Sequence, residues 1–203
     1  MEWPPSSQTL MWLQIATGFF AAVTLMHWLR LLARKFGRVL NMAYYFSPKG
    51  GCLEALLAEL KKARHEILCQ AYSFTSDELT TALVDAKKRG VHVEVILDKS
   101  NEVERYSELH VFLEKGLAPL IDSEHAIAHN KIMIIDQKVV ATGSFNFTNQ
   151  AEQHNAENLL IIKGHPDMVK EYRKNFFVHK SHSKPGVMKQ QPEGKGNEQR
   201  RAA

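Results

Sequence analysis

Four polar residues in the middle of the chain form two pairs, and within each pair the residues are separated by one position. His129 and Lys131 come just before a run of isoleucines and methionine, and Ser144 and Asn146 follow Gly143. Alternate side chains of a β-strand point to the same face, so a hairpin of the two segments would gather all four polar groups at one end. An imidazole, an ammonium group and two neutral donors suit nucleophilic or acid–base chemistry at an anionic phosphorus centre, where negative charge grows in the transition state.

Each of these residues, taken alone, has an ordinary structural explanation. A histidine beside a strand commonly makes a hydrogen bond within the fold, a lysine at a strand edge is solvated, and serine and asparagine after glycine form turns. The combined pattern is much rarer. The spacing H-x-K-x4-D, which Asp136 completes, is expected by chance in roughly one chain in fifty of this length. The Gly-Ser-x-Asn segment close behind makes coincidence rarer by orders of magnitude, so the joint pattern indicates a functional site.

The segments HNKIMIID and GSFNFT resemble the HKD signature of the phospholipase D superfamily. The resemblance extends from about Tyr45 to His179 and is strongest to small bacterial members with a single motif, the Nuc-type endonucleases and the short bacterial phospholipases D. The mitochondrial cardiolipin hydrolase is also similar, because it has a single motif and an N-terminal membrane anchor. The resemblance implies a metal-independent phosphodiesterase that works through a phosphohistidine, with nucleic acid as the expected substrate. A membrane phospholipid is the alternative substrate, and an inactive membrane scaffold is disfavoured because every motif residue is present.

The resemblance implies a role for each residue that matches the signature. His129 would attack phosphorus and form the phosphohistidine, while Lys131 and Asn146 would hold the non-bridging oxygens. Ser144 would donate another hydrogen bond near the phosphate. These four side chains are therefore the expected centre of the active site.

Three further residues have supporting roles by the same resemblance. Glu157, in the segment NAEN, matches the acid that orients the histidine through its second ring nitrogen. Asp136 belongs to the signature but points away from the phosphate in the family, so we expect a structural role for it. Gly143 is likewise expected to be a structural residue of the motif.

Protonation of the leaving oxygen requires a second imidazole, and the chain has one complete H-x-K-x4-D motif. Small family members obtain the second by dimerising, so we expect a homodimer with a shared active site. His125, His154 and His165 are alternative acids within the chain. A metal-dependent mechanism would need clustered ligands, and the nearest approach, Asp122 to His125, is predicted to be a loop. We therefore expect neither a metal nor a cofactor.

Alternating strand and helix patterns surround these residues. The expected helices are 52–66, 76–89, 103–115 and 165–180, and the expected strands lie near 41–47, 67–74, 91–98, 131–136, 138–143 and 158–162, with a turn at Asp136-Gln137. This order predicts an α/β fold with a mixed β-sheet sandwiched between α-helices, the phospholipase D/nuclease fold, preceded by one transmembrane helix.

The segment from Leu10 to Trp28 is apolar, contains no charged residue and is about long enough to cross a bilayer. A cleaved signal peptide for export is one alternative, although the leader lacks a basic residue, and a buried core helix is another. Basic residues follow the segment, namely Arg30, Arg34, Lys35 and Arg38. The positive-inside rule then places the catalytic domain on the cytoplasmic side of a single-pass anchor.

Composition agrees with one domain and accessory ends. The net charge of +4 and the pI near 9.0 favour polyanionic partners, such as nucleic acid or anionic lipid. Two cysteines, Cys52 and Cys69, are too few for a disulfide framework or a four-cysteine zinc site. The predicted layout is a leader (1–9), a transmembrane anchor or uncleaved signal (10–32), a catalytic domain (42–180) and a disordered basic tail (181–203).

Overall fold

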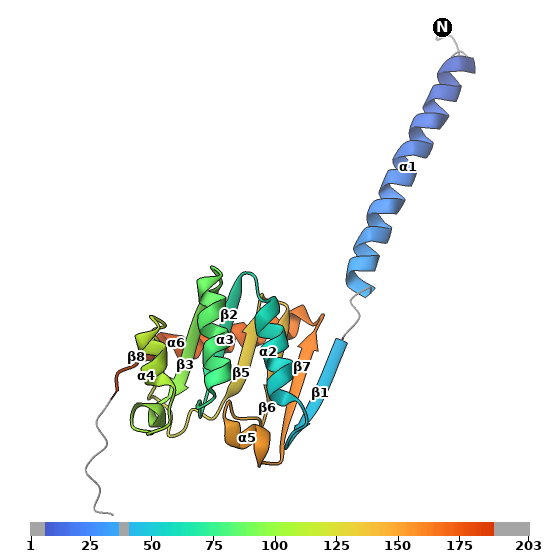
Figure 1. Ribbon diagram of the computed structural model, residues 1–203. Coiled ribbons are helices and arrows are strands. Elements are labelled where there is room, and N and C mark those ends of the chain that lie inside the picture. Colours follow the sequence, from blue (N-terminus) through green and yellow to red (C-terminus); the bar gives the residue numbers. More distant parts are fainter. Residues whose placement is uncertain (1–6, 37–40, 189–203) are drawn as a thin grey trace, which may run out of the picture. The chain divides into compact units, whose positions relative to one another are not determined.

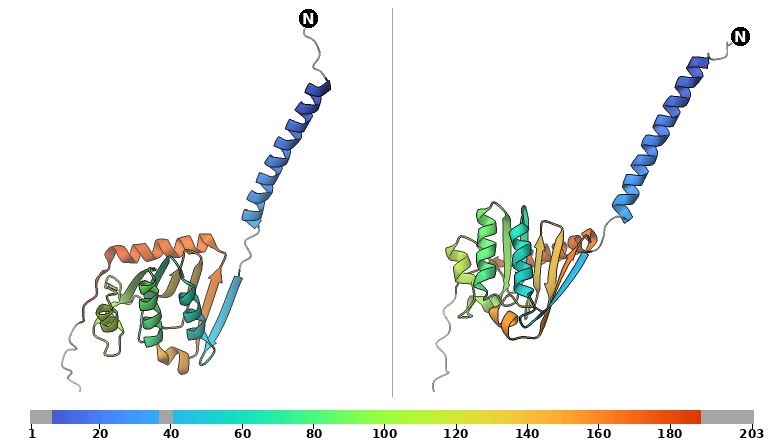
Figure 2. Two further views of the ribbon diagram at one scale, coloured as in Figure 1. Left: turned by 45° about the horizontal axis from the view of Figure 1, so that its top comes forward. Right: turned by 45° about the vertical axis from the view of Figure 1, so that its right-hand side comes forward.

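The computed structural model describes residues 7–36 and 41–188 of the chain, with side-chain environments for residues 7–32 and 41–188. The chain divides into two compact units, residues 1–39 and 40–203. The first contains one long helix, and the second contains a single β-sheet with helices on both faces (Figures 1 and 2). The expected α/β class, with a mixed sheet between helices, is confirmed.

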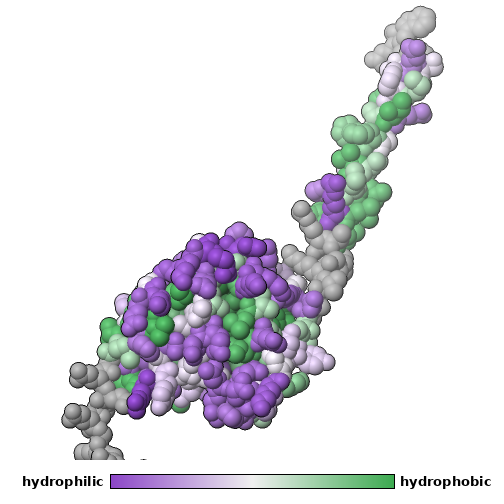
Figure 3. Space-filling view, viewed as in Figure 1, coloured by the Kyte–Doolittle hydropathy of each residue, from purple (hydrophilic) through white to green (hydrophobic). Residues whose placement is uncertain are grey.

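The helix α1 (Ser7–Phe36) is long and apolar enough to cross a membrane. Its apolar part, Ser7–Leu32, has 26 residues, a mean hydropathy of 1.6 and no residue buried within the described chain. The hydroxyls of Thr17 and Thr24 donate to backbone carbonyls of the preceding turn at 2.9 Å, so these polar groups are satisfied within the helix. Figure 3 shows hydrophobic side chains along its length. Arg38, one of the expected flanking basic residues, lies outside the described residues.

Eight strands form one mixed sheet in the order β1-β7-β6-β5-β2-β3-β4-β8 (Figure 1). The pairs β2–β3 and β3–β4 are parallel, and the other pairs are antiparallel. The strands are β1 (Asn41–Ser47), β2 (Glu66–Ala71), β3 (His92–Asp98), β4 (Leu120–Asp122), β5 (Lys131–Ile135), β6 (Val139–Gly143), β7 (Glu157–Lys163) and β8 (Lys184–Pro185). The helices of this unit are α2 (Cys52–Lys62), α3 (Asp77–Lys88), the 3-10 helix η1 (Lys99–Glu102), α4 (Leu109–Glu114), α5 (Asn149–Gln153) and α6 (Pro166–His182).

Both faces of the sheet are covered, and each has its own hydrophobic cluster. Helices α2, α3 and α4 cover one face of the sheet, and α6 covers the other (Figure 2). Side chains of the first three helices belong to one cluster, and Val169 and Phe176 of α6 belong to the other. In β5, Met133 belongs to the first cluster and Ile134 to the second. Burial on both faces is the reason why this strand has a continuous apolar sequence instead of an alternating one.

The helix expected at 103–115 is much shorter in the structure, where α4 spans only Leu109–Glu114. Side chains in the preceding segment bind each other and the backbone. The Ser107 hydroxyl donates to the Asn101 side-chain oxygen at 3.1 Å and accepts a hydrogen bond from the backbone N–H of Leu109 at 3.3 Å. Such local side-chain contacts compete with helical hydrogen bonds, so the residues between η1 and α4 form a folded loop.

The disordered tail was expected to begin at residue 181, and this boundary is wrong. α6 continues to His182, and Lys184–Pro185 forms β8, which pairs with β4. The backbone N–H of Gly186 also donates to the carbonyl of Pro119 at 2.8 Å. The ordered domain therefore extends at least to Gly186, because this short segment covers the edge of the sheet. Residues 189–203 of the expected tail lie outside the described residues.

The opposite edge of the sheet is β1, which pairs with β7 along its whole length. Its side chains alternate, and the set on one face is apolar and exposed, at 51% for Met42, 67% for Tyr44 and 62% for Phe46. Tyr45, between them, packs against the core cluster on the other face. β1 is therefore an edge strand with large apolar side chains in solvent.

Asp136 lies at the end of β5, in the tight turn that leads to β6. Its backbone has a φ of 51°, and the next residue, Gln137, has a φ of 55°. The Asp136 carboxylate accepts hydrogen bonds from three successive backbone N–H groups, those of Arg64, His65 and Glu66, at 2.9, 2.7 and 3.0 Å. These bonds join the β5–β6 turn to the connection between α2 and β2.

Replacement of Asp136 by Asn should lower the free energy of unfolding by about 1–2 kcal/mol, because one amide oxygen replaces a charged group that holds three N–H donors. Asparagine tolerates a positive φ, so the change does not also strain the turn. Urea denaturation of the full-length protein in detergent measures the effect. Gln137→Asn, in the same turn, is the matched control and should change the stability little. Equal stability of Asp136→Asn and wild type would contradict the structural role.

Candidate active site

The residues expected to do chemistry converge at one end of the central strands, called the site end below. Lys131 begins β5, Gly143 ends β6, and Glu157 begins β7, so all three lie at the same end of these adjacent antiparallel strands. Lys131 also pairs with Ala71, the last residue of β2. The site end is the end of the strands next to α5 in Figure 1. Asp136, at the other end of β5, lies about 16 Å away along the strand.

His129 is exposed at the site end and packs against Tyr72, with ring centroids 4.5 Å apart. The Lys131 ammonium lies 4.9 Å from the centre of the same Tyr72 ring and donates to the carbonyl of His129 at 3.0 Å. The Tyr72 backbone N–H donates to the carbonyl of Asn130 at 2.8 Å. Tyr72 therefore holds both expected functional side chains, although no sequence motif marks it.

Lys131 is almost fully buried and makes no ion pair with the described residues. Burial lowers its pKa from the ordinary value, and the nearby Glu157 carboxylate offsets part of that effect. The cation is thus held in a position where an anionic ligand would stabilise it. This is the arrangement expected of a group that neutralises developing negative charge.

Ser144 and Asn146 lie in the loop that follows β6. The Ser144 hydroxyl oxygen accepts hydrogen bonds from the backbone N–H and the side-chain amide of Asn158, at 3.0 and 3.3 Å. Its hydroxyl hydrogen can still donate to a ligand. The side-chain oxygen of Asn146 is buried and has no hydrogen-bond partner among the described residues. Buried polar atoms normally have partners, so this oxygen can accept a hydrogen bond from a donor, whereas only the NH2 group of the same amide can donate to a phosphate oxygen.

Gly143 allows this loop to approach β7. A Cβ at this position would lie 2.2 Å from the backbone carbonyl oxygen of Asn158. The same carbonyl accepts hydrogen bonds from the backbone N–H groups of Ser144 and Phe145, at 3.1 and 3.2 Å. No larger residue fits without displacing β7. Asn158 is the last residue of the segment NAEN, but no role was expected for it, although it contacts Ser144 through both its backbone and its side chain.

Glu157 lies at the site end, but its contacts differ from the expected hydrogen bond to the ring of His129. Its carboxylate accepts a hydrogen bond from the Asn155 side chain at 3.2 Å, and its backbone N–H donates to the Ser47 hydroxyl at 3.2 Å. Within residues 41–188, no hydrogen bond joins Glu157 to the ring of His129. Its orientation of the histidine remains a prediction, whereas its charge does act on Lys131.

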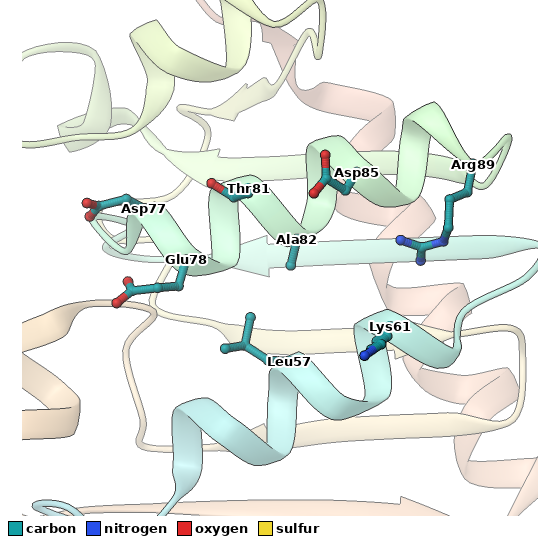
Figure 4. Close-up of a pocket in the computed structure, with 8 residues that line it drawn as sticks. All are labelled: Leu57, Lys61, Asp77, Glu78, Thr81, Ala82, Asp85 and Arg89. Atoms are coloured by element: carbon teal, nitrogen blue, oxygen red, sulfur yellow. The ribbon is translucent and has the colours of Figure 1, made fainter.

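A cavity of about 390 Å³ opens beside the site. It is lined by His129, Lys131 and Thr142 from the sheet region and by Glu171, Tyr172 and Asn175 from α6. A larger cavity, about 630 Å³, lies between α2 and α3, and it contains acidic and basic side chains around Leu57 and Ala82 (Figure 4). No expected site residue lines the larger cavity, so size alone does not identify the place of the chemistry.

The three alternative acids within the chain occupy different positions. His165 caps α6 by accepting a hydrogen bond from the Met168 N–H at 3.2 Å. It follows β7, which has seven residues, so His165 lies about 20 Å from the site end along the strand. His154 is exposed at the end of α5. His125 is held by Asp122, with 3.2 Å between its Nδ1 and the nearer carboxylate oxygen. His165 is therefore too distant to act as the acid.

The segment from Asp122 to His125 was expected to be only a loop, and this description is incomplete. Asp122 ends β4 and is fully buried, and His125 follows in the loop. Two histidines from the end of α6, His179 and His182, lie against the same carboxylate. The Asp–His cluster formed by these four residues brings together parts of the chain that are 57 positions apart.

The chain is similar in sequence to proteins of one known family. Residues 56–179 match the family model described as "Cardiolipin synthase, PLD-like domain". The chain is 40% identical over 141 residues to a phospholipase D of Rickettsia typhi, which covers 70% of this chain and 69% of that protein. It is 35% identical over 111 residues to the mitochondrial cardiolipin hydrolase of Mus musculus, with 55% of this chain and 50% of the relative covered.

Solved structures agree with the sequence relatives. The crystal structure of a phospholipase D family member, Nuc, from Salmonella typhimurium has 32% sequence identity and a TM-score of 0.69, and the match covers 72% of this chain and 98% of that chain. NucT from Helicobacter pylori has 20% identity and a TM-score of 0.66, with 73% of this chain and 100% of that chain covered. The second likeness shows the fold alone.

Replacement of Lys131 by Met should raise the free energy of unfolding by about 1 kcal/mol, because it keeps the side-chain volume and removes a buried charge. The pKa of Lys131 is lowered in the folded state, so this penalty exists when the lysine is charged and fades as pH rises towards the unfolded value of about 10.4. Urea denaturation at pH 7 and above pH 10 tests both statements. Lys138→Met, at an exposed position, is the control. A less stable Lys131→Met would show that the lysine stabilises the fold.

Proposed function

The chain belongs to the phospholipase D superfamily and is one of its phosphodiesterases, and we propose that His129 is the nucleophile with which it attacks phosphorus. The observation that carries this proposal is the position of His129, which is exposed at the site end of the strands beside the buried cation of Lys131. A phosphate that reaches the imidazole also reaches a charge that is poorly neutralised by the protein.

The proposed reaction has two steps. In the first, a ring nitrogen of His129 bonds to phosphorus, the bond to the leaving oxygen breaks, and a second imidazole gives that oxygen its proton. In the second, the same imidazole takes a proton from water, the water oxygen attacks phosphorus, and the bond to His129 breaks. Lys131 and Asn146 bind the non-bridging oxygens throughout, and Ser144 donates to the phosphate from the neighbouring loop. Glu157 is proposed as a positioning residue for the histidine.

The second imidazole is assigned to the partner of a homodimer. His129 is exposed at the site end of the strands. A two-fold axis beside this end would bring the two copies of His129 in a dimer to one phosphate. Lys131 of both protomers then neutralises the phosphate, and the reaction proposed here needs no metal ion at phosphorus. Of the alternative acids, His125 is already held by Asp122 and His165 lies at the far end of β7.

Nucleic acid is the proposed substrate. The chain is basic, with a pI near 9.0, and the cavity beside His129 is lined mainly by polar side chains and not by an apolar channel for acyl chains. The resemblance to Nuc-type endonucleases points the same way. The proposed activity is therefore endonucleolytic cleavage of DNA or RNA.

Phospholipid is the second candidate substrate, and α1 favours it. The apolar part of α1, which has 26 residues, would hold the catalytic domain at a membrane surface. Relatives from Rickettsia are also named phospholipase D. We propose that residues 10–32 are a single-pass anchor, with residues 42–186 as a catalytic domain on the cytoplasmic side because basic residues follow the span. Export through a signal peptide is the alternative use of this segment.

The substrate proposal is tested with the full-length protein in detergent. Labelled single-stranded DNA, RNA and duplex DNA, and vesicles of phosphatidylcholine or cardiolipin, are incubated separately with the protein. We expect cleavage of nucleic acid, and a loss of at least about 1,000-fold in His129→Asn, since loss of a nucleophile removes the covalent route. Release of phosphatidic acid from the vesicles, with intact nucleic acids, would establish the second candidate instead.

The shared site is tested by mixing wild type with His129→Asn in equal amounts, under conditions in which the subunits exchange. About a quarter of the dimers are then wild type, and each heterodimer has one imidazole, so activity should fall to about half of that expected from dilution of active chains. A mixture with Lys138→Met, outside the site, should follow simple addition. Activity proportional to the wild-type fraction would contradict the shared site and would favour His154 as the acid.

A further inference from the structure

The Asp–His cluster stands apart from the catalytic residues and has the composition of a metal site. One candidate ligand atom from each of Asp122, His125, His179 and His182 lies within 4.8 Å of every other. Nδ1 of His179 is 2.6 Å from a carboxylate oxygen of Asp122, Nδ1 of His125 is 3.2 Å from the other oxygen, and Nε2 of His182 is 3.4 Å from the first. We propose that these four residues form a structural Zn²⁺ site.

The donor set is the first argument for zinc. Three imidazole nitrogens and one carboxylate oxygen are four ligands, the number that closes a tetrahedral zinc site. Zinc bonds of about 2.0–2.2 Å place neighbouring ligand atoms roughly 3.4 Å apart, so the observed spacing needs only small side-chain rotations. Both histidines of α6 lie one turn apart near the end of the helix, and Asp122 and His125 have the same spacing in the chain.

The second argument concerns Asp122, which has no exposed surface. Its carboxylate lies against the rings of His179, His125 and His182, which come from two distant segments of the chain. A carboxylate buried among three imidazoles can be matched by protonated rings or by a metal cation, and a metal cation satisfies all four groups at once.

The third argument is an unsatisfied atom. Nε2 of His182 is buried and makes no hydrogen bond within the described residues, although it faces the Asp122 carboxylate. The three rings are packed together, with centroids 5.0–5.4 Å apart. Protonation of all three rings would place three positive charges side by side. Zinc instead binds the neutral imidazoles through their lone pairs, which leaves no charged rings to repel one another.

The position of the cluster indicates what the metal would do. It joins the end of β4 and the end of α6 to the loop that leads to His129. The same loop is fastened further along, because Lys99 donates to the carbonyl of His125 at 2.8 Å and the Ala128 N–H donates to the Asp98 carboxylate at 2.7 Å. Zinc would fix the beginning of this loop, so it would position His129 from a distance and take no part in the reaction at phosphorus. The exposed His125 side chain gives the ion a way in.

Metal analysis of the full-length protein tests the proposal. Protein purified in detergent without a histidine tag should contain about one zinc per chain, and His179→Gln/His182→Gln should contain less than a tenth of that. His154→Gln, a substitution of an exposed histidine outside the cluster, should keep its zinc. Replacement of zinc by Co²⁺ should give the visible absorption bands of tetrahedral cobalt, a readout that does not depend on folding stability or on activity. Wild-type protein without bound zinc, or cobalt protein without these bands, would overturn the proposal.

The role of the metal is tested separately from its presence. Removal of zinc with a chelator should lower the thermal unfolding midpoint by several degrees, and added Zn²⁺ should restore it. Turnover below the new midpoint should fall by at most about 100-fold, whereas His129→Asn loses far more. Complete loss of turnover in folded, zinc-free protein would contradict a structural role. These results stand whichever substrate the enzyme cleaves.

Discussion

The close approach of Gly143 to the backbone of Asn158 is the contact on which the site depends. It keeps β6 and β7 paired up to the last residue of β6, and the loop then turns with two N–H groups on the same carbonyl. Ser144 is fixed through Asn158, and Glu157 is brought towards Lys131. A side chain at 143 would separate the strands and move all of these groups together.

At the site end of β5, the groups expected to bind phosphate lower the stability of the fold. The rest of β5 is buried on both faces by apolar side chains, which stabilise the fold. Its first residue, Lys131, is a buried cation, and the Asn146 oxygen nearby is buried without a partner in the described chain. The buried charge of Lys131 is unfavourable in the free protein, and the proposed phosphate ligand would stabilise it, whereas the Asn146 oxygen needs a donor. The packed strand therefore supports groups that would be unstable in a less rigid frame.

Local patterns predicted most of the fold and selected the residues of the candidate site, whose roles remain predictions. The strands around His129 and Ser144, the Asp136–Gln137 turn and the long helices follow from apolar periodicity and turn residues. Tyr72, Asn158 and the Asp–His cluster did not follow, because their partners come from distant segments and depend on strand order. The helix expected at 103–115 was too long, because Ser107 and Asn101 bind each other before α4 begins. The three-residue strand β4 is too short to give a periodic signal.

The two edges of the sheet differ in their capacity to accept another strand. β8 covers β4 with only two residues, and the covered edge is short. β1, at the other edge, is seven residues long, and exposed edge strands with large apolar side chains are templates for intermolecular pairing. Growth of the sheet by β-augmentation, whether by a peptide or by misassembly, is therefore directional and favours β1. In an anchored protein this liability would be confined to one membrane surface, where chains meet by diffusion in two dimensions.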